Sequence, residues 1–237
     1  MGKRTLRLSL TLMIEALIFF LLLNFHARLV GFLDLIPRNV LEFLLGPKQQ
    51  WLGSLKYDLQ VFMWFTWFSV LLPLIVLITA SITSQRYLRE PQSTLDKAYL
   101  SKRTRFGFYT LGWYKMIVDV GLVSLAGGFL NFFVSTPMEI RYPALISIVI
   151  GSWFIAAISA LIVVIMGTRA VGVVLAVLAG MGMVFVLPDF LPIGLLRYGC
   201  LQSALNIPEY LLTYAMVEGI HLIVILLKQR LPRIVID

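Results

Sequence analysis

The chain of 237 residues is strongly apolar, with 59% hydrophobic and only 14% charged residues. A soluble globular domain carries about 25% charged residues, so this composition excludes an ordinary soluble domain. The net charge of +8 falls mainly beside the apolar runs, where Lys and Arg set topology and meet anionic lipid headgroups. We therefore expect an integral membrane protein in contact with membrane lipid and without a nucleic-acid partner. The single cysteine, Cys200, excludes an intramolecular disulfide and a cysteine-based metal site.

Long apolar runs predict an all-α membrane protein with six transmembrane helices in one domain, residues 1–237. Each run is close to the length of about 20 residues that crosses a hydrocarbon core as a helix. Their expected limits are residues 9–32, 59–83, 109–133, 144–166, 170–187 and 210–227. Pro73 is expected to kink the second span, and residues 135–143 read as a tight connection between spans three and four.

Two of the connections contain helix-breaking residues. Gly46-Pro47 ends any helix that follows the first span. Pro188, Pro192 and Pro208 bracket a less hydrophobic segment between the fifth and sixth spans. We expect short external helices in both places, after spans one and five.

The distribution of positive charge gives the orientation. Most Lys and Arg lie before the first span, between spans two and three, and after the sixth. Because positive residues concentrate in cytoplasmic loops, both termini are predicted to be cytosolic. The natural location for such a chain is a bacterial cytoplasmic membrane.

Motifs that mark membrane enzymes are missing from the sequence. It contains no HExxH pair for zinc, no GxSxG nucleophile and no GxxxxGK[ST] phosphate loop. Acid–base and metal chemistry need several converging ionisable groups, and the paired aspartates that bind metal in intramembrane phosphotransferases are also missing. We therefore do not expect an enzyme, a bound metal or a cofactor held by this chain.

Ionisable residues within the predicted spans are candidates for function, because a charge in lipid is costly. Glu15 lies about two turns into the first span, where it could snorkel toward Arg4 or Arg7 or be buried against another helix. In the third span, Lys115 and Asp119 are spaced i and i+4, which allows an intrahelical ion pair. A contact with a substrate is the alternative for this acid.

Glu218 and His221 stand at i and i+3 on one face of the sixth predicted span. Because histidine can exchange a proton near neutral pH, the pair could relay protons in a transporter. It could equally form an internal hydrogen bond and contact a neighbouring span. The spacing leaves both interpretations open.

The longest polar stretch, residues 84–108, follows the second span and is named here the coupling loop. It contains Arg89-Glu90, then Ser93-Thr94-Leu95-Asp96, then a basic segment from Leu100 to Arg105. The chain re-enters an apolar run at Leu111-Gly112-Trp113-Tyr114-Lys115. This pattern resembles the permease subunits of type-2 ABC exporters, which also have about six spans and cytosolic termini. The chain departs from the family pattern at Ser93, where Gly is usual, and at Arg103, near the usual Pro.

The resemblance implies a transmembrane subunit that is driven by a separate ATPase, with ATP and Mg²⁺ bound by that partner. It also implies a second permease copy, in a homo- or heterodimer, and an amphipathic or hydrophobic cargo such as a peptide, an antibiotic or a lipid. The residues that would contact the ATPase are Arg86, Arg89, Glu90, Ser93, Thr94, Leu95 and Asp96. Charges of both signs there would fix the register of the contact.

Three other interpretations remain open. The coupling loop could be an ordinary solvated, positively charged loop. A proton-coupled secondary transporter would use Glu218 and His221, with Asp119 and Glu15. A non-transporting scaffold subunit needs no site at all.

Overall fold

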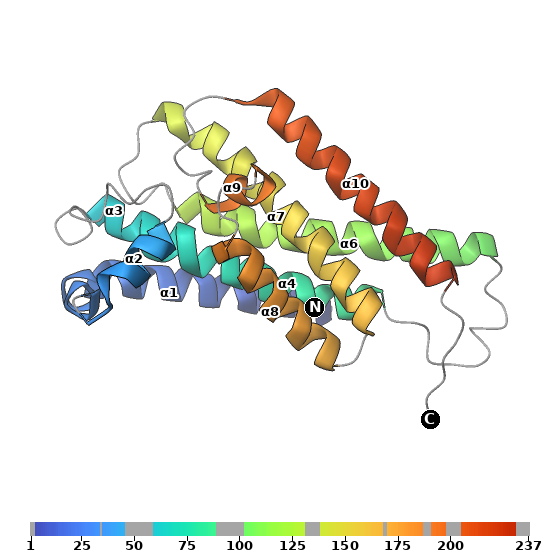
Figure 1. Cartoon of the computed structure of the whole chain (residues 1–237), viewed down its shortest axis with the longest axis horizontal. Helices are drawn as coiled ribbons and strands as arrows, with labels where there is room; N and C mark the ends of the chain where they lie inside the picture. Colours follow the sequence, from blue (N-terminus) through green and yellow to red (C-terminus); the bar gives the residue numbers. More distant parts are fainter. Residues whose placement is uncertain are drawn as a thin grey trace.

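The computed structural model describes residues 3–33, 35–45, 59–88, 102–130, 138–167, 170–186, 191–197 and 205–230, and these residues form helices and short turns with no strand. The helices form an elongated bundle (Figure 1). In chain order they are α1 Lys3–Leu33, α2 Arg38–Leu45, α3 Leu59–Met63, the π-helix η2 Trp64–Leu71, α4 Leu72–Tyr87, α6 Lys102–Phe129, α7 Met138–Met166, α8 Ala170–Val186, α9 Leu191–Arg197 and α10 Ile207–Arg230.

Helix α7 is the centre of the bundle and packs on α4, α6, α8, α9 and α10. Small residues along it are buried and let neighbouring backbones approach closely, as is usual between membrane helices. Gly151 is an example, because a Cβ there would meet the backbone of Leu195 and Leu196 in α9. The Ser152 hydroxyl also donates a 2.8 Å hydrogen bond to Ser124 of α6. The core therefore combines close contacts with a few satisfied hydroxyl groups.

Helices α3, η2 and α4 form one continuous rod, because the residues at the η2 ends keep right-handed helical angles. Pro73 lies in the first turn of α4, directly after the π-helical stretch. Proline has no N–H to donate to the residue four positions earlier, and a wider π turn removes the conflict with that position. The structure thus has a π-helical stretch directly before Pro73, the residue at which the sequence predicted a kink.

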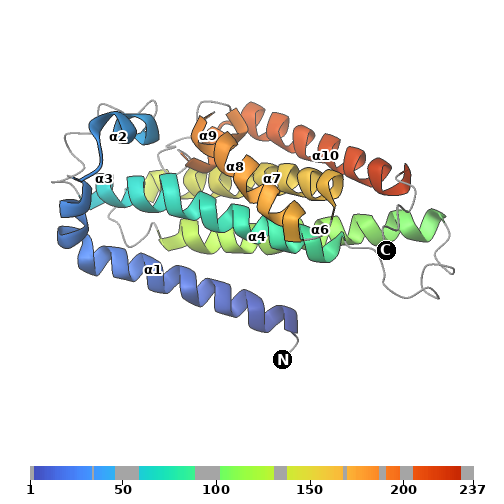
Figure 2. The same ribbon diagram turned by 60° about the horizontal axis from the view of Figure 1, so that its bottom comes forward.

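Helix α1 lies at the side of the bundle and packs on α3 and α6. Figure 2 shows it diverging from the bundle toward the N-terminus. Only 11% of its apolar segment Leu8–His26 is buried. Large apolar side chains on its outer faces are exposed, among them Leu10, Met13 and Leu17. A helix with such faces is suited to a lipid environment.

Four described helices contain segments long and apolar enough to cross a membrane, as expected of an integral membrane protein: Leu8–His26, Ser69–Tyr87, Tyr142–Met166 and Ile207–Gln229. They match predicted spans one, two, four and six. Predicted span five corresponds to the shorter apolar helix α8. Predicted span three corresponds to α6, which carries Lys115 and Asp119 and is less apolar than the other four.

Short helices follow α1 and α8, at the two places where breaks were predicted. Helix α2 lies within the segment expected after span one, and α9 within that expected after span five. The limits of the long helices differ from the predicted ones more than the positions of the short helices do. Helix α6 begins at Lys102, inside the coupling loop, and α7 begins at Met138, inside the expected tight connection. Apolar runs mark the part of a helix that lipid can cover, whereas polar residues extend the same helix beyond it.

Candidate functional site

The first residues of the coupling loop, at the end of α4, pack on α6 just beyond the loop's other end. Gly112 makes this approach possible, because a Cβ there would clash with the backbone oxygen of Tyr87. One turn further along α6, Met116 Sδ lies 2.9 Å from the hydroxyl of Ser84, which also donates to the Ala80 carbonyl. Backbone proximity and a buried polar contact therefore join the two helices.

Asp119 adds a hydrogen bond to the same interface. Its carboxylate is buried, and Oδ2 accepts a 2.6 Å hydrogen bond from the Tyr87 hydroxyl. This described hydrogen bond crosses to α4, whereas the Lys115 side chain, on the same helix as the acid, is exposed. The acid thus links two helices through Tyr87, a residue that the sequence analysis did not single out.

Of the residues expected to contact an ATPase, Arg86 is the one that the structure describes. It lies in the last turn of α4 with an exposed side chain. The others, Arg89, Glu90, Ser93, Thr94, Leu95 and Asp96, lie outside the described residues. The structure does describe the helices on either side of them, α4, which ends at Tyr87, and α6, which begins at Lys102.

A second polar cluster lies between α6 and α10. His221 is buried, and its Nδ1 donates to Glu218 Oε2 at 2.9 Å. The imidazole stacks on the buried indole of Trp113 at 4.8 Å between ring centroids and 14° between planes. Tyr114 also meets the imidazole edge-on, with 5.4 Å between ring centroids. The imidazole is therefore held by one carboxylate and two aromatic rings.

Two nitrogens of this cluster are buried without a hydrogen-bond partner among the described residues, His221 Nε2 and Trp113 Nε1. Glu218 is partly exposed, with 29% of its side chain accessible. Tyr214, one turn earlier on the same helix, interacts with the Glu218 carboxylate. A partly accessible acid beside a buried imidazole is an arrangement through which a proton can pass. Both nitrogens would gain from a polar ligand, because a buried polar atom without a partner is costly.

Glu15 is buried where α1 meets the bundle. Its carboxylate faces Gly127 of α6 and Leu72 of α4, and neither oxygen has a hydrogen-bond partner among the described residues. On the same face of α1, Phe19 packs edge-on against Trp67, whose indole donates to the Gly127 carbonyl at 3.1 Å. The side chains of Arg4 and Arg7 lie outside the described residues. The described carboxylate is thus buried against a neighbouring helix.

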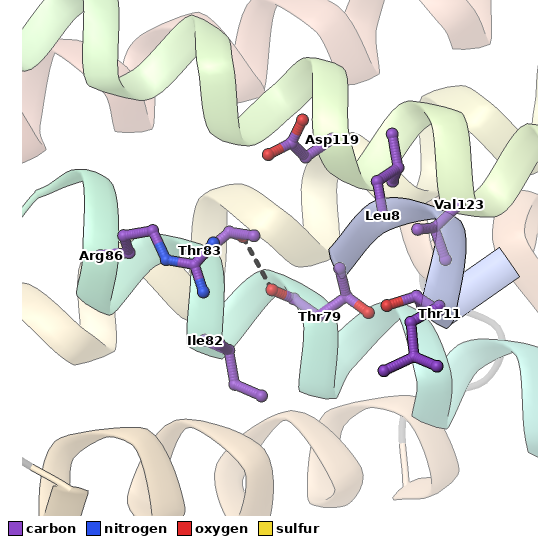
Figure 3. A pocket seen from close by; sticks show the side chains of 9 residues that line it. Leu8, Thr11, Thr79, Ile82, Thr83, Arg86, Asp119 and Val123 are labelled. Carbon is purple, nitrogen blue, oxygen red and sulfur yellow. Dashed lines mark hydrogen bonds between the residues drawn. The ribbon is translucent and has the colours of Figure 1, made fainter. Parts of the chain in front are cut away.

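A groove of about 230 Å³ separates the first turns of α1 from α4 and α6. Figure 3 shows Arg86 entering it from α4, Asp119 from α6, and Leu8 and Thr11 from α1. Groups of both charges therefore line one small space beside several hydroxyls and apolar side chains. Arg86 and Asp119 were each predicted from the sequence, but no sequence pattern indicates that they share a groove.

Several residues of these sites were not predicted as functional. Trp113 and Tyr87 contact residues far away in the sequence, so no local spacing predicts a role for either of them. Gly127 carried a signal, since Gly127-Gly128 within an apolar run favours close helix packing. Among the described residues, no group of three or more His, Cys, Asp and Glu side chains could hold a metal ion.

The chain was also compared with known proteins. No protein-family model matches it, and neither a curated protein nor a solved structure matches it.

Proposed function

We propose that this chain is the transmembrane subunit of an ATP-driven ABC exporter, with six spans and both termini in the cytosol of a bacterial cell. A separate ATPase subunit binds ATP and Mg²⁺ and contacts the coupling loop. A second permease copy, identical or homologous, completes the transport path. The cargo is amphipathic or hydrophobic, such as a peptide, an antibiotic or a lipid.

The packing of α4 on α6 is the observation that carries this proposal. A partner that pushes on the coupling loop has to move helices, and this requires the loop to be anchored on both sides. Tyr87 and Asp119 join the helices by a hydrogen bond, and Gly112 brings their backbones together. A displacement of the loop would then move α4 and α6 as one unit.

The charges of the coupling loop support a protein partner. Arg86 is exposed at the end of α4, and Arg89, Glu90 and Asp96 follow in the sequence. Charged residues of both signs give an interface its register and discriminate against wrong partners. A loop that served only to set topology would need positive charge alone.

A crosslinking experiment tests the partner. Cys200 is replaced by Ser, and Leu95→Cys places a photoactivatable thiol reagent within the coupling loop of the full-length protein in its membrane. We expect a crosslinked protein that is labelled by an azido-ATP analogue in the presence of Mg²⁺. Charge reversal at Glu90 and Asp96 should weaken this crosslink, whereas the matched charge change Lys115→Glu, outside the loop, should not. A crosslink that never captures an ATP-binding protein would contradict the proposal.

The cluster around His221 favours a second candidate, a proton-coupled secondary transporter. Its supporting observation is a buried imidazole that is hydrogen-bonded to a partly exposed acid. In that case His221→Gln would abolish transport and a protonophore would do the same. Under the exporter proposal, His221→Gln would lower stability through the lost contact with Glu218 and leave transport dependent on ATP.

A further inference from the structure

Glu15 is a buried acid whose charge no described neighbour would balance. The residue is 1% exposed, and neither carboxyl oxygen has a hydrogen-bond partner in the described part of the chain. It lies near the middle of the apolar segment Leu8–His26 of α1. A carboxylate in this setting would lose its hydration and gain no ion pair or hydrogen bond in exchange. Burial at this position therefore favours the neutral, protonated acid.

The helices around Glu15 bring no described charge close to its carboxyl group. On α6 the nearest ionisable residue is Asp119, about 12 Å along the helix axis from the contact, and on α4 it is Arg86, about 21 Å along. The segments α3 and η2 contain no ionisable residue. On α1 itself, His26 is about 16 Å and Arg7 about 12 Å along the axis, and the side chain of Arg7 lies outside the described residues.

The attachment of α1 to the bundle is small, and Glu15 belongs to it. Helix α1 packs on α3 and α6 with only 11% of its apolar segment buried. Phe19, one turn after Glu15, is fully buried and packs on Trp67. A charged Glu15 would need hydration or a counter-charge, and the surfaces of Gly127 and Leu72 offer neither. Ionisation therefore requires α1 to separate from α6 at this point.

The groove between α1, α4 and α6 gives water a route toward this carboxyl group. Thr11 and Val123 line the groove, and each lies one helical turn from the buried contact, Thr11 from Glu15 and Val123 from Gly127. Figure 3 shows the hydroxyl-bearing side chains of Thr11 and Thr79 in the groove. Hydroxyl groups donate and accept hydrogen bonds with water, so a proton that leaves Glu15 can reach solvent through this space.

We propose that Glu15 is a proton-binding site that controls the attachment of α1, which packs on the bundle while the acid is neutral and separates when the acid loses its proton. The packed state then binds one proton more than the separated state, so a rise in pH favours separation. The ratio of separated to packed helix should change by at most about tenfold per pH unit, as one proton requires. The site needs no ATPase, so it stands whether or not the exporter proposal holds.

Double electron–electron resonance on the full-length protein in nanodiscs tests this site. In a Cys200→Ser background, spin labels are attached through Met13→Cys on α1 and Leu222→Cys on α10, two exposed positions. These helices lie on opposite sides of the bundle (Figure 1, Figure 2). As the pH is raised from mildly acidic to mildly alkaline, a narrow distribution of distances between the labels should give way to a longer and broader one.

Variants of Glu15 show whether its proton causes the change. Glu15→Gln keeps the shape of the neutral acid and cannot ionise, and Glu15→Met keeps a similar length without a polar donor. At least one of the two should fold and keep the narrow distribution at every pH. Glu209→Gln, in the first turn of α10, is the matched control and should respond to pH like the wild type. The proposal would be overturned by a wild-type distribution that ignores pH, by a pH response that persists in the Glu15 variants, or by its loss in Glu209→Gln.

Discussion

Gly127 is a position where the missing side chain makes room for side chains from two other helices. A Cβ on this residue would meet the Glu15 carboxylate and a methyl group of Leu72, and both lie closer than atoms can approach. The same residue accepts the hydrogen bond from Trp67 through its carbonyl. Contacts from α1, η2 and α4 thus converge on one position of α6.

Replacing Gly127 by Ala should therefore loosen the attachment of α1. Overpacking a close contact costs about 1–3 kcal/mol, so the melting temperature of the purified protein should fall by several degrees. The matched control is Gly182→Ala in α8, where a Cβ meets nothing within 4 Å. Because alanine is more favourable than glycine within a helix, this control substitution should stabilise the protein by about 0.5–1 kcal/mol. If both variants melted like the wild type, the described contact at Gly127 would be refuted.

The hydrogen bond from the Tyr87 hydroxyl to Asp119 can be tested by a single substitution. Tyr87→Phe removes the donor to Asp119 and leaves a buried acid without that partner, at a cost of about 1–3 kcal/mol. Tyr142→Phe is the control, because the Tyr142 side chain is 69% exposed. Thermal unfolding in detergent should separate the two variants, with a loss in melting temperature confined to Tyr87→Phe. Equal losses of melting temperature in the two variants would show that this hydrogen bond does not stabilise the α4–α6 interface.

At the scale of elements, the pair α4 and α6 is the unit on which the exporter proposal depends. Ser84 and Met116 touch across the pair, with 2.9 Å between Oγ and Sδ. If the two helices move together during transport, then a covalent link between them should be tolerated. If they slide or separate, the link should stop transport.

A crosslink between these positions distinguishes the two cases. In a Cys200→Ser background, Ser84→Cys and Met116→Cys are joined by a short bifunctional methanethiosulfonate. The linked protein should keep most of its transport activity and of the ATP hydrolysis of its partner. Each single cysteine variant, treated in the same way, is the control for the reagent. Loss of transport only in the linked double variant would contradict movement as one unit.

For the whole molecule, the sequence predicted the class of fold and the general positions of its long helices. Runs of apolar residues report burial in lipid directly, so α1, α4, α7 and α10 were expected where membrane-length segments are found. The short helices α2 and α9 followed from Gly46-Pro47 and the later prolines. The starts of α6 and α7 were missed because polar residues such as Lys102 extend a helix without any apolar signal.

The sites were predictable only in part, because their partners come from distant segments. Glu218 and His221 were paired from their spacing, and the structure gives them a hydrogen bond. The stacking of His221 on Trp113 depends on how α10 lies against α6, which no local pattern contains. The meeting of Arg86 and Asp119 in one groove likewise depends on the packing of three helices.

Under the exporter proposal, ATP is the energy source for transport by the whole molecule. Inside-out membrane vesicles that contain the full-length protein and its partner should accumulate a fluorescent amphipathic probe when Mg-ATP is added, and a protonophore should not prevent it. The charge-reversed variant at Glu90 and Asp96 should lose this accumulation, whereas His221→Gln should keep its dependence on ATP. Accumulation that ignores ATP and collapses with the protonophore would contradict the exporter proposal.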